Sequence, residues 1–187
     1  MDAALVAAIS LASIVAFFVF AQVARARGVA RRGETLTRAR DIAQYVPYFF
    51  FVPYAVIAAR PGPEVELPVP VRSAGVVLIV VGVAFSCWAI ATLGRHYDLE
   101  LEIHRDHEIV QRGPYRVVRH PVYTGLMLHF AGACLATGNL VLFLGTALVT
   151  FPALYLRARV EERLLREQFG AAYDAYARRV GMLVPLL

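Results

Sequence analysis

The chain has 187 residues, of which 59% are hydrophobic and only 18% are charged. A soluble domain of this size could not bury so much apolar surface, so the composition predicts an integral membrane protein. The net charge of +5 comes from arginines spread over the segments beside the apolar stretches. This spread excludes a basic nucleic-acid recognition motif and makes the lipid bilayer the expected partner.

The apolar stretches predict an all-α, polytopic membrane protein with about five transmembrane helices. Residues 3–22, 42–59 and 74–93 are each long enough, or nearly so, to cross a bilayer as a helix. Residues 123–137 and 140–156 are shorter, and the turn signal Gly138-Asn139 between them predicts a tight helical hairpin. The proline-rich stretch 61–70 is expected to be a short, stiff loop.

The arginine distribution predicts the orientation in the membrane. Six arginines lie in 25–40, five in 95–119 and six from Arg157 onward, whereas only Arg60 and Arg72 lie in the loop between. Because basic residues accumulate on the cytoplasmic side, we expect the N-terminus and the 60–72 loop outside and the C-terminus inside. The first apolar stretch has no basic residue before it and several arginines after it, which is typical of a retained anchor rather than a cleaved signal peptide.

The polar segment 112–125 interrupts the apolar stretches and contains two proline-defined corners. Gly113-Pro114 predicts a turn, and Pro121 restricts His120 to an extended conformation just before a span begins. Such a connector could aim the His120 imidazole into a site. The alternative is an anchoring belt of Arg and Tyr side chains at the membrane interface.

The segment 157–180 predicts an amphipathic helix that continues from the last span and is interrupted near Gly170. Arg157 and Glu161 are four residues apart and therefore share a face. Glu162 is turned about 100° away, toward Arg159, Arg163 or Arg166, so one acid can face a site while the other faces solvent. An exposed ion pair of little energetic weight is the alternative.

No metal site is expected. The chain has five histidines but no His-Glu-x-x-His pair, and its two cysteines are far apart within apolar stretches. His104 and His107 are three residues apart and flanked by acids, a pattern that also suits a solvated loop.

Three features together resemble the isoprenylcysteine carboxyl methyltransferase family, which consists of integral membrane enzymes that use S-adenosyl-L-methionine. They are the Gly-Pro-Tyr…Arg-His-Pro-x-Tyr-x-Gly segment, the Glu161-Glu162 pair and the following Phe-Gly…Tyr…Tyr pattern. The resemblance covers residues 93–185 and divides the chain into N-terminal spans, 1–92, and a catalytic half, 93–187. It implies that Arg157 binds the substrate and that Glu161 contacts the cofactor, both as catalytic residues. The remaining implied cofactor-binding residues are His107, Glu108, Ile109, Val110, Tyr115, His120, Pro121, Val122 and Tyr123.

The family implies a lipidic acceptor, with the carboxylate of a prenylated cysteine as the first expectation. Three alternatives remain. Similar small membrane proteins methylate phospholipid amines or thiols, which need a base such as His120. Membrane sterol reductases use NADPH, for which Arg112, Arg116 and Arg119 could form a phosphate-binding cluster. The third alternative is a non-enzymatic membrane subunit.

Overall fold

The computed structural model describes residues 3–29, 35–38, 62–97, 102–104 and 108–185. The predicted span 42–59 and the predicted cofactor-binding residue His107 lie outside these ranges.

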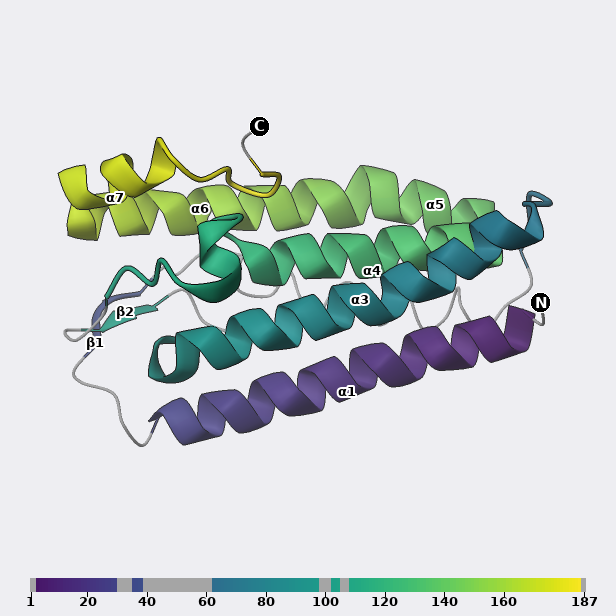
Figure 1. Cartoon of the computed structure of the whole chain (residues 1–187), viewed down its shortest axis with the longest axis horizontal. Helices are drawn as coiled ribbons and strands as arrows, with labels where there is room; N and C mark the ends of the chain where they lie inside the picture. Colours follow the sequence, from purple (N-terminus) through teal and green to yellow (C-terminus); the bar gives the residue numbers. More distant parts are fainter. Residues whose placement is uncertain (1–2, 30–34, 39–61, 98–101, 105–107, 186–187) are drawn as a thin grey trace.

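The described chain is a bundle of long helices, as the composition predicts (Figure 1). The helices are α1 (Ala3–Val29), α3 (Val69–Leu93), α4 (Pro121–Thr137), α5 (Leu140–Gly145), α6 (Phe151–Phe169) and α7 (Ala171–Ala177). A π-helical turn, Thr146–Thr150, joins α5 to α6, so the chain is helical from Leu140 to Phe169.

Three helical stretches are long and apolar enough to cross a membrane: Ala8–Gly28, Val69–Leu93 and Leu140–Phe169. The predicted all-helical membrane fold is therefore confirmed, whereas the count of five crossings stays a prediction. The described residues also form a small antiparallel sheet that the sequence did not predict, in which β1 (Thr35–Arg38) pairs with β2 (Glu102–His104).

Proline and glycine set most of the helix ends. Helix α3 begins at Val69, five residues before the predicted start at 74, because Pro68 and Pro70 suit the first turn of a helix. The predicted hairpin between α4 and α5 is confirmed: Gly138 adopts the left-handed conformation and the Asn139 side chain caps the next helix by accepting from the Leu142 amide. Gly170, with φ +50°, ends α6 and makes the predicted break.

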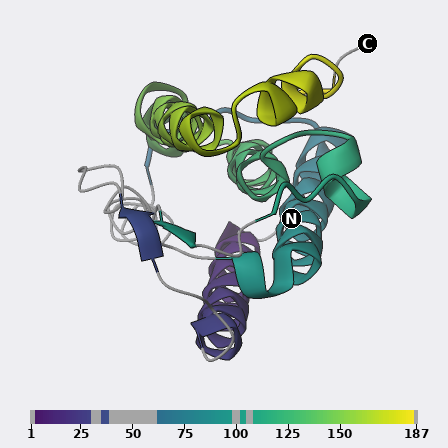
Figure 2. The same cartoon turned by 90° about the vertical axis from the view of Figure 1, so that its left-hand side faces the viewer.

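Helices α3 and α4 pack backbone to backbone along their lengths. Gly75 and Gly82 of α3 face Gly132 and Gly125 of α4, and a Cβ atom on any of these four would collide with the facing helix. Small residues at such a seam are typical of membrane helices, where close approach supplies the van der Waals contact that holds helices together. Figure 2 shows α4 between α3 and α6, with α1 below them.

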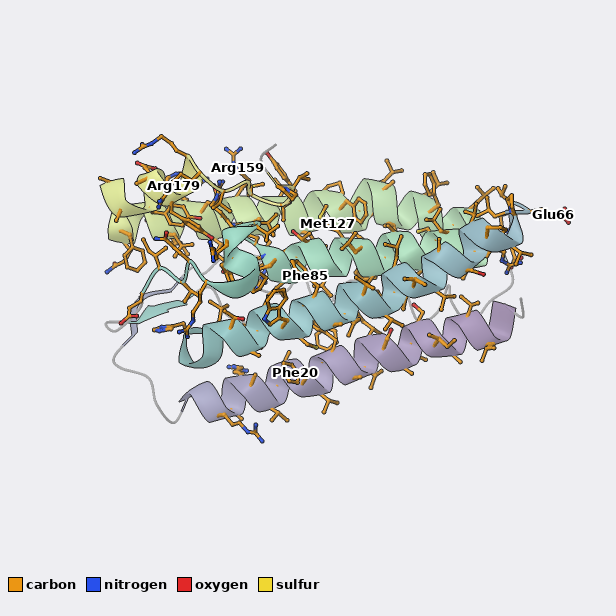
Figure 3. The ribbon with its side chains drawn as sticks, viewed as in Figure 1. Phe20, Glu66, Phe85, Met127, Arg159 and Arg179 are labelled. Atoms are coloured by element: carbon orange, nitrogen blue, oxygen red, sulfur yellow. The ribbon has the colours of Figure 1, made fainter. Side chains whose placement is uncertain are left out.

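The helix directions bring the arginine-rich segments around the start of α4 and the end of α6 to one end of the bundle. Helices α1 and α3 run in the same direction, and their C-terminal ends lie beside the start of α4 and the end of α6 (Figure 1). Figure 3 shows Glu66 at the opposite end from Arg159 and Arg179. The arrangement is the one that the arginine distribution requires, although the direction of insertion itself stays a prediction.

We expect the end of the bundle with Glu66 to lie outside. In a chain whose Cys87 and Cys134 are replaced by alanine, Glu66→Cys should react with a membrane-impermeant maleimide in intact cells. Arg163→Cys, at the other end, should react only after permeabilisation. The opposite labelling pattern would reverse the orientation.

The glycine seam should be sensitive to a single methyl group. Gly82→Ala drives a Cβ into the Gly125 carbonyl, and overpacking of this kind costs about 1–3 kcal/mol, so the melting temperature in detergent should fall. Gly145→Ala is the matched control, because its Cβ would have no neighbour within 4 Å among the described residues. We expect this control to melt at the wild-type temperature or higher; equal melting of all three proteins would contradict the close packing.

Candidate active site

The connector between α3 and α4 has the two corners that its prolines predict. Gly113, with φ +57°, and Pro114 begin a single 3₁₀ turn, Gly113–Arg116. His120 lies directly before α4 and is not extended as predicted: its φ of −121° and ψ of +63° fall outside both the helical and the extended regions, because its carbonyl already accepts from the Thr124 amide in the first turn of α4. The imidazole is thus held at the start of a membrane helix rather than within it.

His120 is buried between two carboxylates of α6. Its Nδ1 lies 3.3 Å from Glu161 Oε2, and its Nε2 lies 3.5 Å from Glu162 Oε1. The ring stacks on Tyr123, with centroids 5.7 Å apart and planes 12° apart. His120 therefore joins the start of α4 to the C-terminal half of α6.

Arg157 reaches the same cluster one helical turn before Glu161. It is buried, and its Nε donates a hydrogen bond of 2.8 Å to the Tyr123 hydroxyl. The same hydroxyl lies near enough to Glu161 to interact with it electrostatically. Tyr123 consequently stands between the arginine and the acid that share this face of α6.

The two neighbouring acids do not divide between site and solvent as predicted. The Glu161 side chain is 36% exposed and Glu162 is only 3% exposed. Glu162 binds Arg119 at 2.5 Å and Arg166 at 3.0 Å, and it accepts from the Tyr173 hydroxyl at 3.4 Å. The turn toward Arg166 is confirmed, but the expectation of a solvent-facing acid is wrong because α7 folds back over α6 after Gly170.

The structure brings together His120, Tyr123, Arg157 and Glu161 from the predicted set. Tyr115 is buried nearby, and its carbonyl accepts a 2.6 Å hydrogen bond from the Tyr176 hydroxyl. The other predicted residues that the structure describes differ in their burial and contacts. Pro121 is buried, Val122 accepts at its carbonyl from Ser86, Ile109 and Val110 are half-buried, and Glu108 is exposed.

Sequence reasoning missed the part played by Arg119 and by the residues after α7. Arg119 was assigned only to a cluster for a phosphate, whereas its guanidinium is engaged with Glu162. The available signal was the pair of tyrosines, Tyr173 and Tyr176, whose spacing places both rings on one face of a short helix. Both are buried against the connector and α6.

Burial and the two neighbouring carboxylates shift the pKa of His120 in opposite directions. Burial by itself lowers the pKa of His120 because it disfavours the charged ring. The hydrogen bonds and negative charges of Glu161 and Glu162 outweigh this effect, so the pKa of His120 is raised. Burial also raises the pKa of the Tyr115 hydroxyl and brings the pKa of Tyr176 to about 12, so both stay neutral donors.

Comparison with known proteins identifies a family and several relatives of this chain. Residues 71–172 match the phospholipid methyltransferase family. A probable protein-S-isoprenylcysteine O-methyltransferase of Oryza sativa subsp. indica is 29% identical over 160 residues, which are 84% of each chain. Methanethiol S-methyltransferase 2 of Bradyrhizobium diazoefficiens is 31% identical over 137 residues, which are 65% of this chain and 52% of that protein.

A solved structure shares the fold. The eukaryotic intramembrane Ras methyltransferase, isoprenylcysteine carboxyl methyltransferase, superposes with a TM-score of 0.57 at 24% identity. The match covers 78% of this chain but only 49% of the other, so this chain spans about half the length of that structure.

The three helical stretches long enough to cross a membrane, together with these relatives, define an integral membrane methyltransferase. The chain belongs to the phospholipid methyltransferase family, whose match covers more than half of its residues.

The charge on His120 should make the stability of the protein depend on pH. Because the folded-state pKa is raised above the unfolded value of about 6.5, the contribution of His120 is fully present below that value and is lost as the pH rises through the folded pKa. Wild-type protein and His120→Gln should therefore differ most in melting temperature near pH 6 and least near pH 9, as measured in detergent. A difference that does not vary with pH would show that His120 is neutral throughout.

Proposed function

We propose that this protein transfers a methyl group from S-adenosyl-L-methionine to a lipidic acceptor, with the carboxylate of a prenylated cysteine or a similar small amphiphile as the favoured acceptor. The observation that carries the proposal is the Tyr123 bridge. This hydroxyl accepts from Arg157, a buried cation, and lies near Glu161, a partly exposed anion on the same face of α6. A site with both charges at fixed positions suits a cationic donor and an anionic acceptor together.

The residues around His120 fit the cofactor. S-adenosyl-L-methionine presents a sulfonium, an ammonium and a carboxylate, and when bound it supplies an electrophilic methyl group. Glu161 offers a carboxylate that solvent still reaches, and Tyr123 offers an aromatic face for a cation. His120 lies between Glu161 and Glu162 and stacks on Tyr123, so it holds the ring and the partly exposed acid of this site in place. The other implied cofactor residues, His107, Glu108, Ile109, Val110, Tyr115, Pro121 and Val122, belong to the same proposal.

Arg157 is the proposed acceptor-binding residue. The Tyr123 hydroxyl accepts from its Nε and so orients the plane of the guanidinium. A planar guanidinium can donate two parallel hydrogen bonds to one carboxylate. A carboxylate is ionised at neutral pH and needs no general base. Alignment with the methyl group and exclusion of water would supply most of the acceleration.

An apolar cavity supports a lipophilic acceptor. The cavity has a volume of about 820 Å³ and lies between α1 and α3, where Val19, Phe20, Val23, Arg27, Ile90 and Ala91 line it. Figure 3 shows Phe20 on the side of α1 that faces α3. Gly94 also lines the cavity, and Tyr97, three residues later, lies near enough to Arg157 to interact with it electrostatically. The proposed orientation places this end of the bundle at the cytoplasmic face.

The relative that methylates methanethiol makes a thiol acceptor the second candidate. A thiol or an amine must lose a proton, and His120 is the residue considered for this role. Its raised pKa favours the protonated ring, which is a poor base, so the site favours an acceptor that is already ionised. NADPH is disfavoured because Arg119, needed for the phosphate-binding cluster, is engaged with Glu162.

Substitutions of Glu161 and Arg157, the two charged residues that α6 contributes to the proposed site, should impair different steps. Glu161→Gln should weaken S-adenosyl-L-methionine binding about ten- to a hundredfold, because a hydrogen bond to a charged group contributes about 1.5–3 kcal/mol. Arg157→Lys should bind the cofactor with nearly wild-type affinity but lose methyl transfer to a small S-prenylated cysteine, since lysine lacks the planar fork. Calorimetry and a radiolabelled methyl-transfer assay measure the two effects.

The matched control is Arg159→Lys, an exposed arginine two residues along the same helix, which should behave as wild type in both assays. Normal turnover of Arg157→Lys would remove the arginine-bound carboxylate from the proposal. Absence of cofactor binding by the wild-type protein would remove methyl transfer from S-adenosyl-L-methionine altogether.

A further inference from the structure

The residues that follow α7 lie across the connector. We call residues 177–183 the C-terminal strap. Its carbonyls accept from the connector at three successive points: Gly181 from the Arg119 amide at 2.8 Å, Met182 from the His120 amide at 3.0 Å and Leu183 from the Thr124 hydroxyl at 2.8 Å. Val118 and Gly181 also form a parallel β-bridge. The strap therefore supplies hydrogen-bond acceptors for the backbone amides of the connector at the point where the connector enters α4.

The Arg119 side chain holds this strap to α6. Its Nε and Nη2 bind Glu162 Oε1 at 2.6 and 2.5 Å, and its Nη1 donates to the carbonyls of Ala177 and Val180. The side chain is only 9% exposed. A single guanidinium thus supplies donors both to a buried carboxylate and to strap carbonyls, a task for which the arginine fork is suited and the lysine ammonium is not.

These contacts determine where His120 lies. Its backbone amide is fixed by the strap, and its Nε2 faces the carboxylate whose position Arg119 sets. Glu161 lies on the other ring nitrogen, and the ion pair that the structure shows for it is the one with His120 rather than with a strap residue. Arg119 therefore controls both the backbone and one side of the ring of His120.

We propose that Arg119 is a positioning residue: by locking the C-terminal strap onto the connector and onto Glu162, it holds His120 in the geometry that the methyl donor needs. This inference rests on the proposed function. Arg119 itself touches neither the cofactor nor the acceptor in this arrangement. It acts through the strap and through Glu162, so most of its effect should disappear when the strap is absent.

The test is a double-mutant cycle of Arg119→Gln and a chain that ends at Tyr176, which lacks every strap carbonyl that accepts from the Arg119 side chain or from the connector. Titration calorimetry on monodisperse full-length protein in detergent measures the dissociation constant of S-adenosyl-L-methionine. Each single change should raise this constant about tenfold or more, and the combination should raise it little further, because both remove the same connection. Single effects that multiply in the combined variant, or an unchanged constant in Arg119→Gln, would overturn the proposal.

Two further variants separate positioning from a general loss of stability. Arg119→Lys retains the charge opposite Glu162 but cannot reach both sets of partners, so its dissociation constant should lie between those of the wild type and Arg119→Gln. Arg163→Gln removes an exposed arginine next to Glu162 on α6 and should bind the cofactor as wild type does. If Arg119→Gln does not give folded protein, Thr124→Val, which removes the bond to Leu183, should raise the dissociation constant in the same direction by a smaller factor.

Amide hydrogen exchange distinguishes failure of this inference from failure of the proposed function. Exchange at the amides of Arg119 and His120 should accelerate in Arg119→Gln and stay at the wild-type rate in Arg163→Gln. If the wild-type protein does not bind S-adenosyl-L-methionine, the proposed function fails while the exchange result still reports on the strap. An unaltered exchange rate in Arg119→Gln would overturn the strap inference by itself.

Discussion

The buried carboxylate of Glu162 is the interaction on which the site depends. A carboxylate with so little exposure to water is strongly destabilising unless cations and donors surround it. Arg119 comes from the connector, Arg166 from the next turn of α6 and Tyr173 from α7. Satisfying one charge thus requires three segments to converge. The fold-back of α7 and the position of the connector both follow from this requirement.

This arrangement gives two adjacent glutamates different tasks. Consecutive residues on a helix point about 100° apart, so α6 presents Glu161 and Glu162 to different surroundings. Glu162 is enclosed by its cations and serves the frame. Glu161 keeps part of its surface open beside His120 and Tyr123, where a ligand can approach. Glu162 therefore pairs with the buried cations of the frame, whereas Glu161, in the same helical turn, stays accessible to a ligand.

The packing of the helices fixes the position of the site along the bundle axis. The glycine seam holds α4 against α3 at backbone distance, and the Ser86 hydroxyl of α3 donates to the carbonyl of Val122 in the first turn of α4. His120 and Tyr123 are consequently anchored to a rigid part of the bundle. Arg157 meets Tyr123 from the neighbouring helix, so the bridge between cation and anion spans two packed helices rather than a loop. Sites built on such elements hold their geometry more closely than sites built on loops.

Local patterns in the sequence determined the membrane class, the helical hairpin at Gly138-Asn139, the break at Gly170 and the two corners of the connector. These features depend on hydrophobic length and on backbone preferences of glycine and proline, which act over a few residues. The resemblance to a methyltransferase family named the residues that meet, His120, Tyr123, Arg157 and Glu161. Only the tertiary structure decided that Glu162 is the buried acid, that Arg119 neutralises it and that the strap crosses the connector. Helical periodicity shows that Glu161 and Glu162 point about 100° apart, but it does not show which of the two another segment will cover. That choice was made by α7, which returns over α6, and by Arg119 of the connector, which is 43 residues before Glu162 and therefore beyond the reach of local sequence patterns.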